Sequence, residues 1–416
     1  MPFNLGEFMR LGRDANLLVL SGGVISVPYG YLVVLQTIYL KSIGFDEGAI
    51  GIVLGLSTLV GSLLTVPFGI LSDRYSKKWI LIAGELFTGV AWLAYGFSTD
   101  LNVLYASSIL MGAGNATFSA STALLAEETT EGERTAAFSL SFFAYMLGST
   151  IGALGCGIPD ILAATYGLGV MESYRPLYLG AFLFSLLSGA MLLPLREIQR
   201  TRKEVRVIPT RSRAEIVKLA TTNGIVALGA GFAIPLLPLW LFLKFGVGGG
   251  ELAVLNVITN GLMAVSYLMT PALVRRVGHV GGIVSVQLSA TALLLAMPLT
   301  GSYQAVAVLF IARSFLMNLA GPINSAFMMS IVHPEERASA AAISSSFSGV
   351  SWGLPNSLGQ GMGGFMFKAG MLDQPLYVCG TLYAVATGLF YWFFRGRDSK
   401  PKSEVTGEKG DKISRI

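Results

Sequence analysis

Long apolar runs without charged residues alternate with short polar clusters along almost the whole chain. A helix needs about 20 apolar residues to cross roughly 30 Å of membrane hydrocarbon. Runs of that order recur throughout the sequence, so the pattern predicts membrane-spanning helices. We expect twelve, at residues 17–40, 48–71, 79–98, 101–125, 136–164, 176–195, 217–243, 252–274, 280–299, 303–331, 338–367 and 375–394.

The faintest break in this pattern separates the ninth run from the tenth. Residues 280–332 contain a single charge, Arg313, and the break rests on Pro298, Gly301, Ser302 and Tyr303. A stretch of this length exceeds one span, and glycine and proline mark turns. We therefore expect two helices here.

The composition agrees with a bilayer as the solvent. Of 416 residues, 53% are hydrophobic and 13% are charged, whereas soluble domains carry roughly 25% charged residues. Cys156 and Cys379 lie far apart in apolar runs, with neither metal spacing nor a disulfide framework. Residues 1–16 lack a secretory signal pattern, so the first run is expected to remain as a helix. The sequence predicts an all-α membrane protein without cofactor or metal.

Positive charges are distributed unevenly between the expected loops. Of the 29 lysines and arginines, 24 fall on the side of the two termini, and Arg313 falls inside the tenth run. The remaining basic residues are Lys41, Arg175, Lys244 and Lys368. Cytoplasmic loops of membrane proteins are enriched in lysine and arginine. This predicts cytoplasmic termini in a cell membrane, inner or plasma, and it argues against reading the net charge of +5 as a nucleic-acid site.

An internal repeat appears when the sequence is shifted by about 203 residues. The pairs that come into register are Lys41 with Lys244, Asn115 with Asn318, and residues 132–137 with 335–340. The sequence thus predicts two pseudo-symmetric six-helix bundles. Their expected bounds are 1–195 and 217–394, joined by a cytoplasmic linker at 196–216 and followed by a cytoplasmic tail at 395–416.

The loop between the second and third runs carries a recognisable pattern. It contains Gly69, Asp73, Arg74, Lys77 and Lys78 at spacings that resemble the signature loop of the major facilitator superfamily. Ser76 stands where that family usually has glycine. A weaker copy follows the eighth run, with Arg275, Arg276 and Gly278. The resemblance covers roughly residues 15–395 and implies secondary transport by alternating access.

The resemblance implies a gating role for this loop. A glycine at a helix end allows close approach of a neighbour, and Asp73 can interact with basic groups or a helix N-terminus. We expect these residues, with Arg275, Arg276 and Gly278, to stabilise the outward-open state. The alternative is that Arg74, Lys77 and Lys78 only anchor the topology.

Charged side chains within membrane spans are energetically costly, and Arg313 and Glu85 are two such residues. In the family, the first, fourth, seventh and tenth helices line the cavity. Arg313 and Asn324 share one face of the tenth helix, so both are expected to bind substrate. The alternative for Arg313 is a structural contact between helices. Glu85 lies in the third helix, which the family places at the periphery, so we expect a packing or latch role and not a proton carrier.

Further cavity candidates are uncharged. Tyr29 and Gln36 lie seven residues apart on one face of the first helix, and Phe232 is the repeat partner of Tyr29. Ser121 in the fourth helix is the repeat partner of Asn324. Each of these side chains is equally compatible with helix packing. Pro235 and Pro238 are expected to kink the seventh helix.

The sequence predicts a secondary transporter of a small organic solute. Because no Gly-Lys dipeptide occurs, there is no phosphate-binding loop for ATP. The family suggests proton-coupled efflux of drug-like, amphipathic or anionic compounds by a monomer. Residues 148–153 lack the proline of the antiporter element Gly-Pro-x-x-Gly-Gly, which leaves uptake open as well.

Two alternative functions come from other classes, an enzyme and a membrane sensor, and the sequence disfavours the enzyme. An enzyme is disfavoured because His279 and His333 are the only histidines and no nucleophile, base and orienting group come together. A membrane sensor that binds its solute without transporting it is compatible with the same fold. Counterflow of a labelled solute would distinguish the sensor from the transporter.

Overall fold

The computed structural model describes residues 11–196, 212–331 and 337–396. These residues form helices joined by short loops, without a strand among them. The first half of the chain contains α2 Arg13–Ser42, α3 Glu47–Arg74, α4 Lys77–Phe97, α5 Leu101–Ala116, α6 Phe118–Glu127, α7 Glu131–Ala153, η1 Leu154–Gly157, α8 Ile158–Tyr166 and α9 Val170–Leu192. The second half contains α10 Arg213–Ala233, α11 Leu237–Phe245, α12 Gly249–Ala296, η2 Met297–Leu299, α13 Tyr303–Ile331, α14 Arg337–Lys368 and α15 Gln374–Phe394.

Each of the twelve expected spans coincides with one or two of these helices over most of its length. Ten helical segments of the described residues are long and apolar enough to cross a membrane. The other two expected spans, 252–274 and 338–367, lie within α12 and α14. Many large apolar side chains face outward, among them Leu183 and Val308, as expected where the surroundings are lipid. The prediction of an all-α membrane protein is confirmed.

Breaks between helices occur where the local chemistry requires them. The faint break between the ninth and tenth runs is real, because η2 leads to an extended Thr300 and α13 starts at Tyr303. Gly278 has φ of 76° and ψ of −178° inside α12, so the eighth span turns into the ninth there. A residue with a side chain would be strained at that φ. Pro235 lies in the break between α10 and α11, which confirms the predicted interruption of the seventh span.

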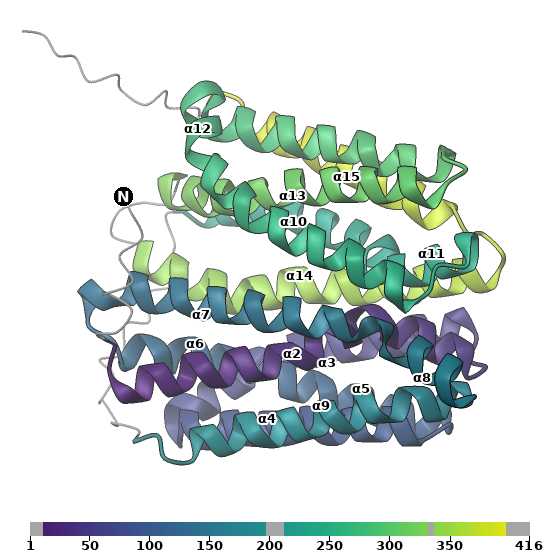
Figure 1. The fold of residues 1–416 in the computed structure, drawn as a ribbon. Helices are drawn as coiled ribbons and strands as arrows, with labels where there is room; N and C mark the ends of the chain where they lie inside the picture. Colours follow the sequence, from purple (N-terminus) through teal and green to yellow (C-terminus); the bar gives the residue numbers. More distant parts are fainter. Residues whose placement is uncertain (1–10, 197–211, 332–336, 397–416) are drawn as a thin grey trace, which may run out of the picture.

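The helices form two groups that follow the chain (Figure 1). Helices α2 to α9, purple to teal, pack mainly against one another, and α10 to α15, green to yellow, do the same. Helix α14 is different, because it packs along α3 of the first group as well as along α10. We call the two groups the first half and the second half. The expected bounds at 196–216 and 395 fall mostly at residues 197–211 and 397–416, outside the described residues.

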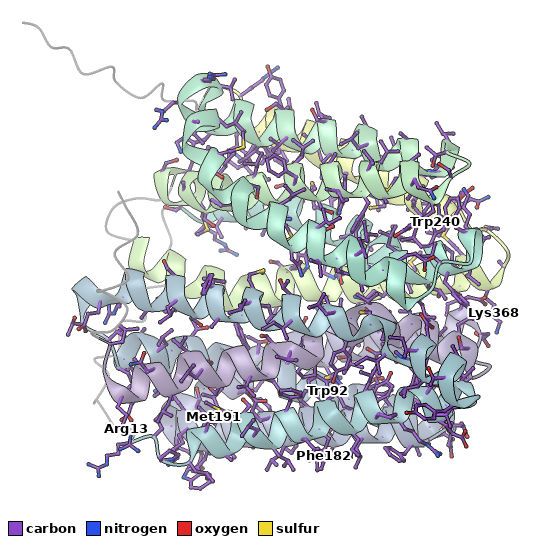
Figure 2. The ribbon with its side chains drawn as sticks, in the orientation of Figure 1. Arg13, Trp92, Phe182, Met191, Trp240 and Lys368 are labelled. Atoms are coloured by element: carbon purple, nitrogen blue, oxygen red, sulfur yellow. The ribbon has the colours of Figure 1, made fainter. Side chains whose placement is uncertain are left out.

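The bundle has two ends that carry different loops. Arg13 lies at one end and Lys368 and Trp240 lie at the other (Figure 2). We call the end with Arg13 the terminal end, because both chain termini leave the helices there, and the other the opposite end. Trp92 lies in the interior of the first half and is 1% exposed.

Candidate functional site

A first cavity lies where the two halves meet. It has a volume of about 230 Å³. We call it the central cavity, and its lining residues are Tyr29, Leu32, Val33, Gln36, Val53, Leu54, Ser57, Thr58, Trp92, Tyr95, Met111, Asn115, Pro235 and Gln360. Most of these side chains come from α2, α3, α4 and α5, while Pro235 and Gln360 come from the second half. The lining is aromatic, aliphatic and amide, which suits an amphipathic organic molecule.

A second cavity lies within the first half and has a volume of about 350 Å³. We call it the Glu85 cavity, and it is lined by Leu18, Ser21, Gly22, Ile25, Tyr29, Leu81, Gly84, Glu85, Thr88, Gly114, Asn115, Thr117, Phe118, Ser121, Tyr145 and Leu192. Among these lining residues, Glu85 alone is charged. Its walls therefore combine one carboxylate with apolar and hydroxyl groups.

Tyr29 and Asn115 form a wall shared by both cavities. The Tyr29 hydroxyl donates a hydrogen bond to Oδ1 of Asn115 at 2.6 Å. The Tyr29 ring meets the edge of Trp92, with ring centroids 5.1 Å apart and planes at 73°. This ring contact and hydrogen bond fix the tyrosine between α2, α4 and α5. Asn115, which the sequence singled out as a repeat position, thus makes an interhelical hydrogen bond on the walls of both cavities.

Glu85 is half-buried and held by serines of α9. Its Oε1 accepts a hydrogen bond from Oγ of Ser188 at 3.2 Å, and its backbone carbonyl accepts one from Ser185. The same Ser188 hydroxyl lies 3.2 Å from the carbonyl oxygen of Ser21 on α2, so its single proton is shared between the two acceptors. These contacts orient the carboxylate without supplying a positive charge from the cavity lining. The structure thus places on a cavity wall a residue that the sequence suggested was peripheral.

The central cavity is closed toward the opposite end by contacts between the halves. Nε2 of Gln360 donates to Oγ1 of Thr58 at 3.2 Å and to Oδ1 of Asn356 at 2.6 Å. Further out, Nζ of Lys368 lies 3.1 Å from Oδ2 of Asp46. Oδ2 of Asp160 accepts from the amide of Gly249 at 3.0 Å. Among these, the contacts of Gln360 with Thr58, Lys368 with Asp46 and Gly249 with Asp160 join the two halves, whereas the bond from Gln360 to Asn356 lies within α14.

Glycines allow α3 and α14 to pack closely at that end. A Cβ added to Gly51 would lie 2.6 Å from the carbonyl oxygen of Gln360 and 2.9 Å from Cα of Gly364. A Cβ on Gly55 would lie 2.8 Å from the carbonyl oxygen of Ser357. Small residues permit such backbone contact between membrane helices. The opposite end is therefore shut by backbone packing as well as by polar contacts.

The predicted substrate residues divide between the cavities and the helix interfaces. Tyr29 and Gln36 line the central cavity, and Ser121 lines the Glu85 cavity. Arg313, Asn324 and Phe232 line neither. Phe232 is 4% exposed, and its backbone lies beside Gly359 and Gly363 of α14. Nδ2 of Asn324 donates to Oδ1 of Asn223 on α10 at 3.2 Å.

Arg313 is buried between helices of the second half. It is 6% exposed, its Nη2 donates to the hydroxyl of Tyr383 on α15 at 3.1 Å, and its guanidinium lies 5.8 Å from that ring centroid. Its Nε is buried without a hydrogen-bond partner. This geometry matches the interhelical contact that the sequence left open beside a substrate role.

The loop motif forms contacts inside the first half. Lys77 is 8% exposed, and its Nζ lies 3.3 Å from both Oδ1 of Asp73 and Oε1 of Glu127. Nζ of Lys78 donates to the carbonyls of Leu193 at 2.6 Å and Leu195 at 3.0 Å, just beyond the C-terminus of α9. A lysine there satisfies carbonyls that the helix leaves unpaired. Both lysines thus have structural contacts.

Other motif positions have distinct surroundings. Ser76, at the position where the family pattern has glycine, caps α4, because its Oγ accepts from the amide of Trp79 at 3.3 Å. A Cβ on Gly69 would meet nothing within 4 Å, so no close helix approach occurs at that glycine in this conformation. Arg74, Arg275 and Arg276 are exposed.

Comparison with known families decides the classification. Residues 18–354 match the Major Facilitator Superfamily. The chain belongs to the Major Facilitator Superfamily. It is therefore an integral membrane transporter of that superfamily, as the loop motif and helix pattern indicated.

Relatives in this superfamily differ in what they carry. The chain is 27% identical over 217 residues to an uncharacterized MFS-type transporter of Methanocaldococcus jannaschii, covering 50% of this chain and 53% of that protein. It is 28% identical over 222 residues to the 4-hydroxybenzoate transporter PcaK of Pseudomonas aeruginosa, covering 53% and 46%. It is 28% identical over 150 residues to the class H tetracycline resistance protein of Pasteurella multocida, covering 36% and 35%. The chain spans about half or less of the length of these relatives.

Solved structures show the same fold over nearly the whole chain. A bacterial homolog of the human lysosomal transporter Spinster, inward-facing and occupied, matches with a TM-score of 0.74 at 14% identity, covering 91% of this chain and 95% of that one. The nucleoside transporter NupG matches with a TM-score of 0.72 at 14% identity, covering 92% and 100%. The fold of the superfamily is therefore shown.

Proposed function

We propose that this superfamily member is a secondary active transporter that exports a small amphipathic organic solute from the cell by alternating access, in exchange for protons. The observation that carries this proposal is the closed opposite end, where α3 and α14 pack through Gly51 and Gly364 above the central cavity. Parallel six-helix repeats in this superfamily move solutes by rocking about a site between the halves.

The proposal includes an orientation. The excess of lysine and arginine on the side of the termini supports cytoplasmic termini in the cell membrane. The closed end then faces outward, and the described conformation is the inward-facing one. Residues 1–195 and 217–394 serve as the two moving bundles, the chain works as a monomer, and the motif residues Asp73 and Arg74 act when the terminal end closes.

Separate observations support the direction of transport and its coupling to protons. Relatives named for tetracycline resistance and multidrug resistance favour export, and one named for 4-hydroxybenzoate transport keeps aromatic acids among the solutes to be tested. Glu85 supplies a carboxylate on a cavity wall, which is a group that can take up and release a proton.

The test begins with a thermal-shift screen of solutes on the purified protein, including tetracyclines and aromatic carboxylates, because a bound solute raises the unfolding temperature. Each hit is then measured by counterflow in proteoliposomes, with and without a pH gradient. We expect counterflow, and faster export when the receiving side is acidic. Binding without counterflow would identify a sensor and overturn the transport proposal.

A further inference from the structure

We propose that the Glu85 cavity binds an amphipathic organic cation, with the Glu85 carboxylate as its counter-charge. This site is separate from the Arg313 position that the sequence favoured for an anionic solute. Its physiological meaning rests on the proposed transport function, but binding itself does not.

The charge of the lining determines the charge of the ligand. Glu85 is the one charged side chain among the lining residues, and the polar contact of its Oε1 is the hydroxyl of Ser188 at 3.2 Å. A carboxylate within a membrane span is costly without a partner of opposite charge. An anion would add repulsion to this cost, whereas a cation would remove it.

Aromatic rings around the carboxylate fit the rest of such a ligand. Tyr29 of α2, Phe118 of α6 and Tyr145 of α7 all line the cavity. Ring faces attract organic ammonium groups, and this attraction is stronger where water is excluded. Leu18, Ile25, Leu81 and Leu192 provide apolar surface for a hydrocarbon body. The volume of about 350 Å³ lies within the range of small-molecule sites.

The surroundings also define what competes with the cation. Facing Glu85 across the cavity, the titratable groups are the phenols of Tyr29 and Tyr145, while α9 contributes Ser188 and α5 contributes Asn115. A proton on the carboxylate removes its charge, so proton and cation exclude each other at one group. Export of a cation in exchange for a proton follows from this competition.

The cavity borders the bundle surface on one side and the central cavity on the other. Phe118 lines it and is 65% exposed, so the wall at Phe118 reaches the surface of the helix bundle. On the inner side, the Tyr29–Asn115 pair separates it from the central cavity. A rotation of Tyr29 away from Asn115 would join the two spaces and lead a ligand from Glu85 toward Gln360.

The experiment measures equilibrium binding of benzyltrimethylammonium to the purified full-length protein in lipid nanodiscs. Its charge is fixed, so any pH dependence of the Kd reports a protein group. Phenylacetate, of similar size and opposite charge, is the ligand control. Glu172→Gln is the matched protein control, because Glu172 is exposed and glutamine also satisfies its capping contact to Gly169.

We expect benzyltrimethylammonium to bind more tightly than phenylacetate, with a Kd that rises as the pH falls. Glu85→Gln should raise the Kd at least about tenfold, since charged hydrogen bonds and ion contacts are worth this much when partly desolvated. It should also remove the pH dependence, whereas Glu172→Gln should change neither. An unchanged Kd in Glu85→Gln, or tighter binding of phenylacetate, would overturn the proposal.

A second measurement on the wild-type protein covers the case in which Glu85→Gln fails to fold. Dicyclohexylcarbodiimide labels protonated carboxyl groups in apolar surroundings, and mass spectrometry locates the label. We expect labelling at Glu85 that benzyltrimethylammonium prevents; labelling that the cation leaves unchanged counts against the site. Cation binding at Glu85 without counterflow would leave this inference standing and refute transport, and counterflow of solutes without cation binding would do the reverse.

Discussion

The hydroxyl of Tyr29 lies 2.6 Å from Oδ1 of Asn115, and this hydrogen bond forms part of the wall between the central cavity and the Glu85 cavity. Tyr29→Phe removes the hydroxyl donor and leaves Oδ1 of Asn115 without this hydrogen bond. We expect the free energy of unfolding to fall by about 1 kcal/mol, the net value of such a bond. Denaturation in detergent measures the change. Tyr166→Phe, at a tyrosine that is 70% exposed, should have no effect.

Asp46 gives the closed end a dependence on pH. Its Oδ1 accepts from the amide of Ala49 at 2.9 Å, and this bond, with Lys368 beside Oδ2, holds the pKa of Asp46 below its usual value. A group with a lowered folded pKa stabilises the fold above its unfolded pKa, and the contribution disappears as the pH falls through the folded pKa.

We therefore expect Asp46→Ala to cost about 1 kcal/mol at neutral pH through loss of the helix cap. Thermal denaturation in detergent should show this difference at about pH 7 and show it shrinking as the pH falls through the folded pKa of Asp46, which lies below the unfolded value of about 3.9. Asp46→Asn keeps a capping side chain and should cost less. An Asp46→Ala deficit that persists unchanged in acid would contradict the assignment.

Packing at Gly51 sets the conformation of the opposite end. Because a Cβ there would lie 2.6 Å from a carbonyl oxygen of α14, Gly51→Ala should push α3 and α14 apart and increase the population that is open at this end. Alkylation of Met371→Cys, at an exposed position, should become faster. Gly361→Ala is the control on α14, where a Cβ meets nothing within 4 Å. Equal rates in both variants would refute the packing argument.

Substitution of Asp73 is expected to weaken the closure of the terminal end. In the proposal Asp73 acts when the terminal end closes, so Asp73→Asn should weaken the closed form and shift the protein toward the conformation that is open at the terminal end. The contact of Asp73 with Lys77 at 3.3 Å lies inside the first half and does not by itself close this end. Faster alkylation of Val277→Cys would report the shift. An unchanged rate would leave Asp73 with a local contact to Lys77 and without a gating role.

Arg313 offers a direct choice between its two assignments. If it serves structure, Arg313→Ala should lower the free energy of unfolding by about 3 kcal/mol or more, because the Tyr383 hydroxyl loses a charged donor and the core gains a hole. Tyr383→Phe should cost less. Normal stability in Arg313→Ala with lost binding of an anionic solute would instead support the substrate role.

The sequence predicted the helices far better than the cavities. The length of each uncharged run and the turn residues at its ends locate the spans. Gly278 and Pro235 mark two of the breaks, because glycine permits a positive φ and proline interrupts a helix. A helical stripe says which residues share a face but not what faces them. Arg313 and Asn324 share a stripe, yet one contacts Tyr383 on α15 and the other Asn223 on α10.

Glu85 lies on a cavity wall that its position in the sequence did not predict. An ionisable residue inside a span was visible in the sequence, and the general position of its helix led to a packing role. Its cavity is lined by small and polar residues of other helices, among them Ser21, Gly114 and Ser121, which no local pattern in the third span encodes.

The central claim of alternating access is tested most directly by distances between the halves. Spin labels at Tyr75→Cys and Val277→Cys report the terminal end, and labels at Val170→Cys and Met371→Cys report the opposite end; all four positions are exposed, and both native cysteines are buried. Double electron–electron resonance in nanodiscs should show two populations at each end, with the opposite end lengthening as the terminal end shortens when pH or a solute changes. A single unchanging distance at both ends under all conditions would contradict the account.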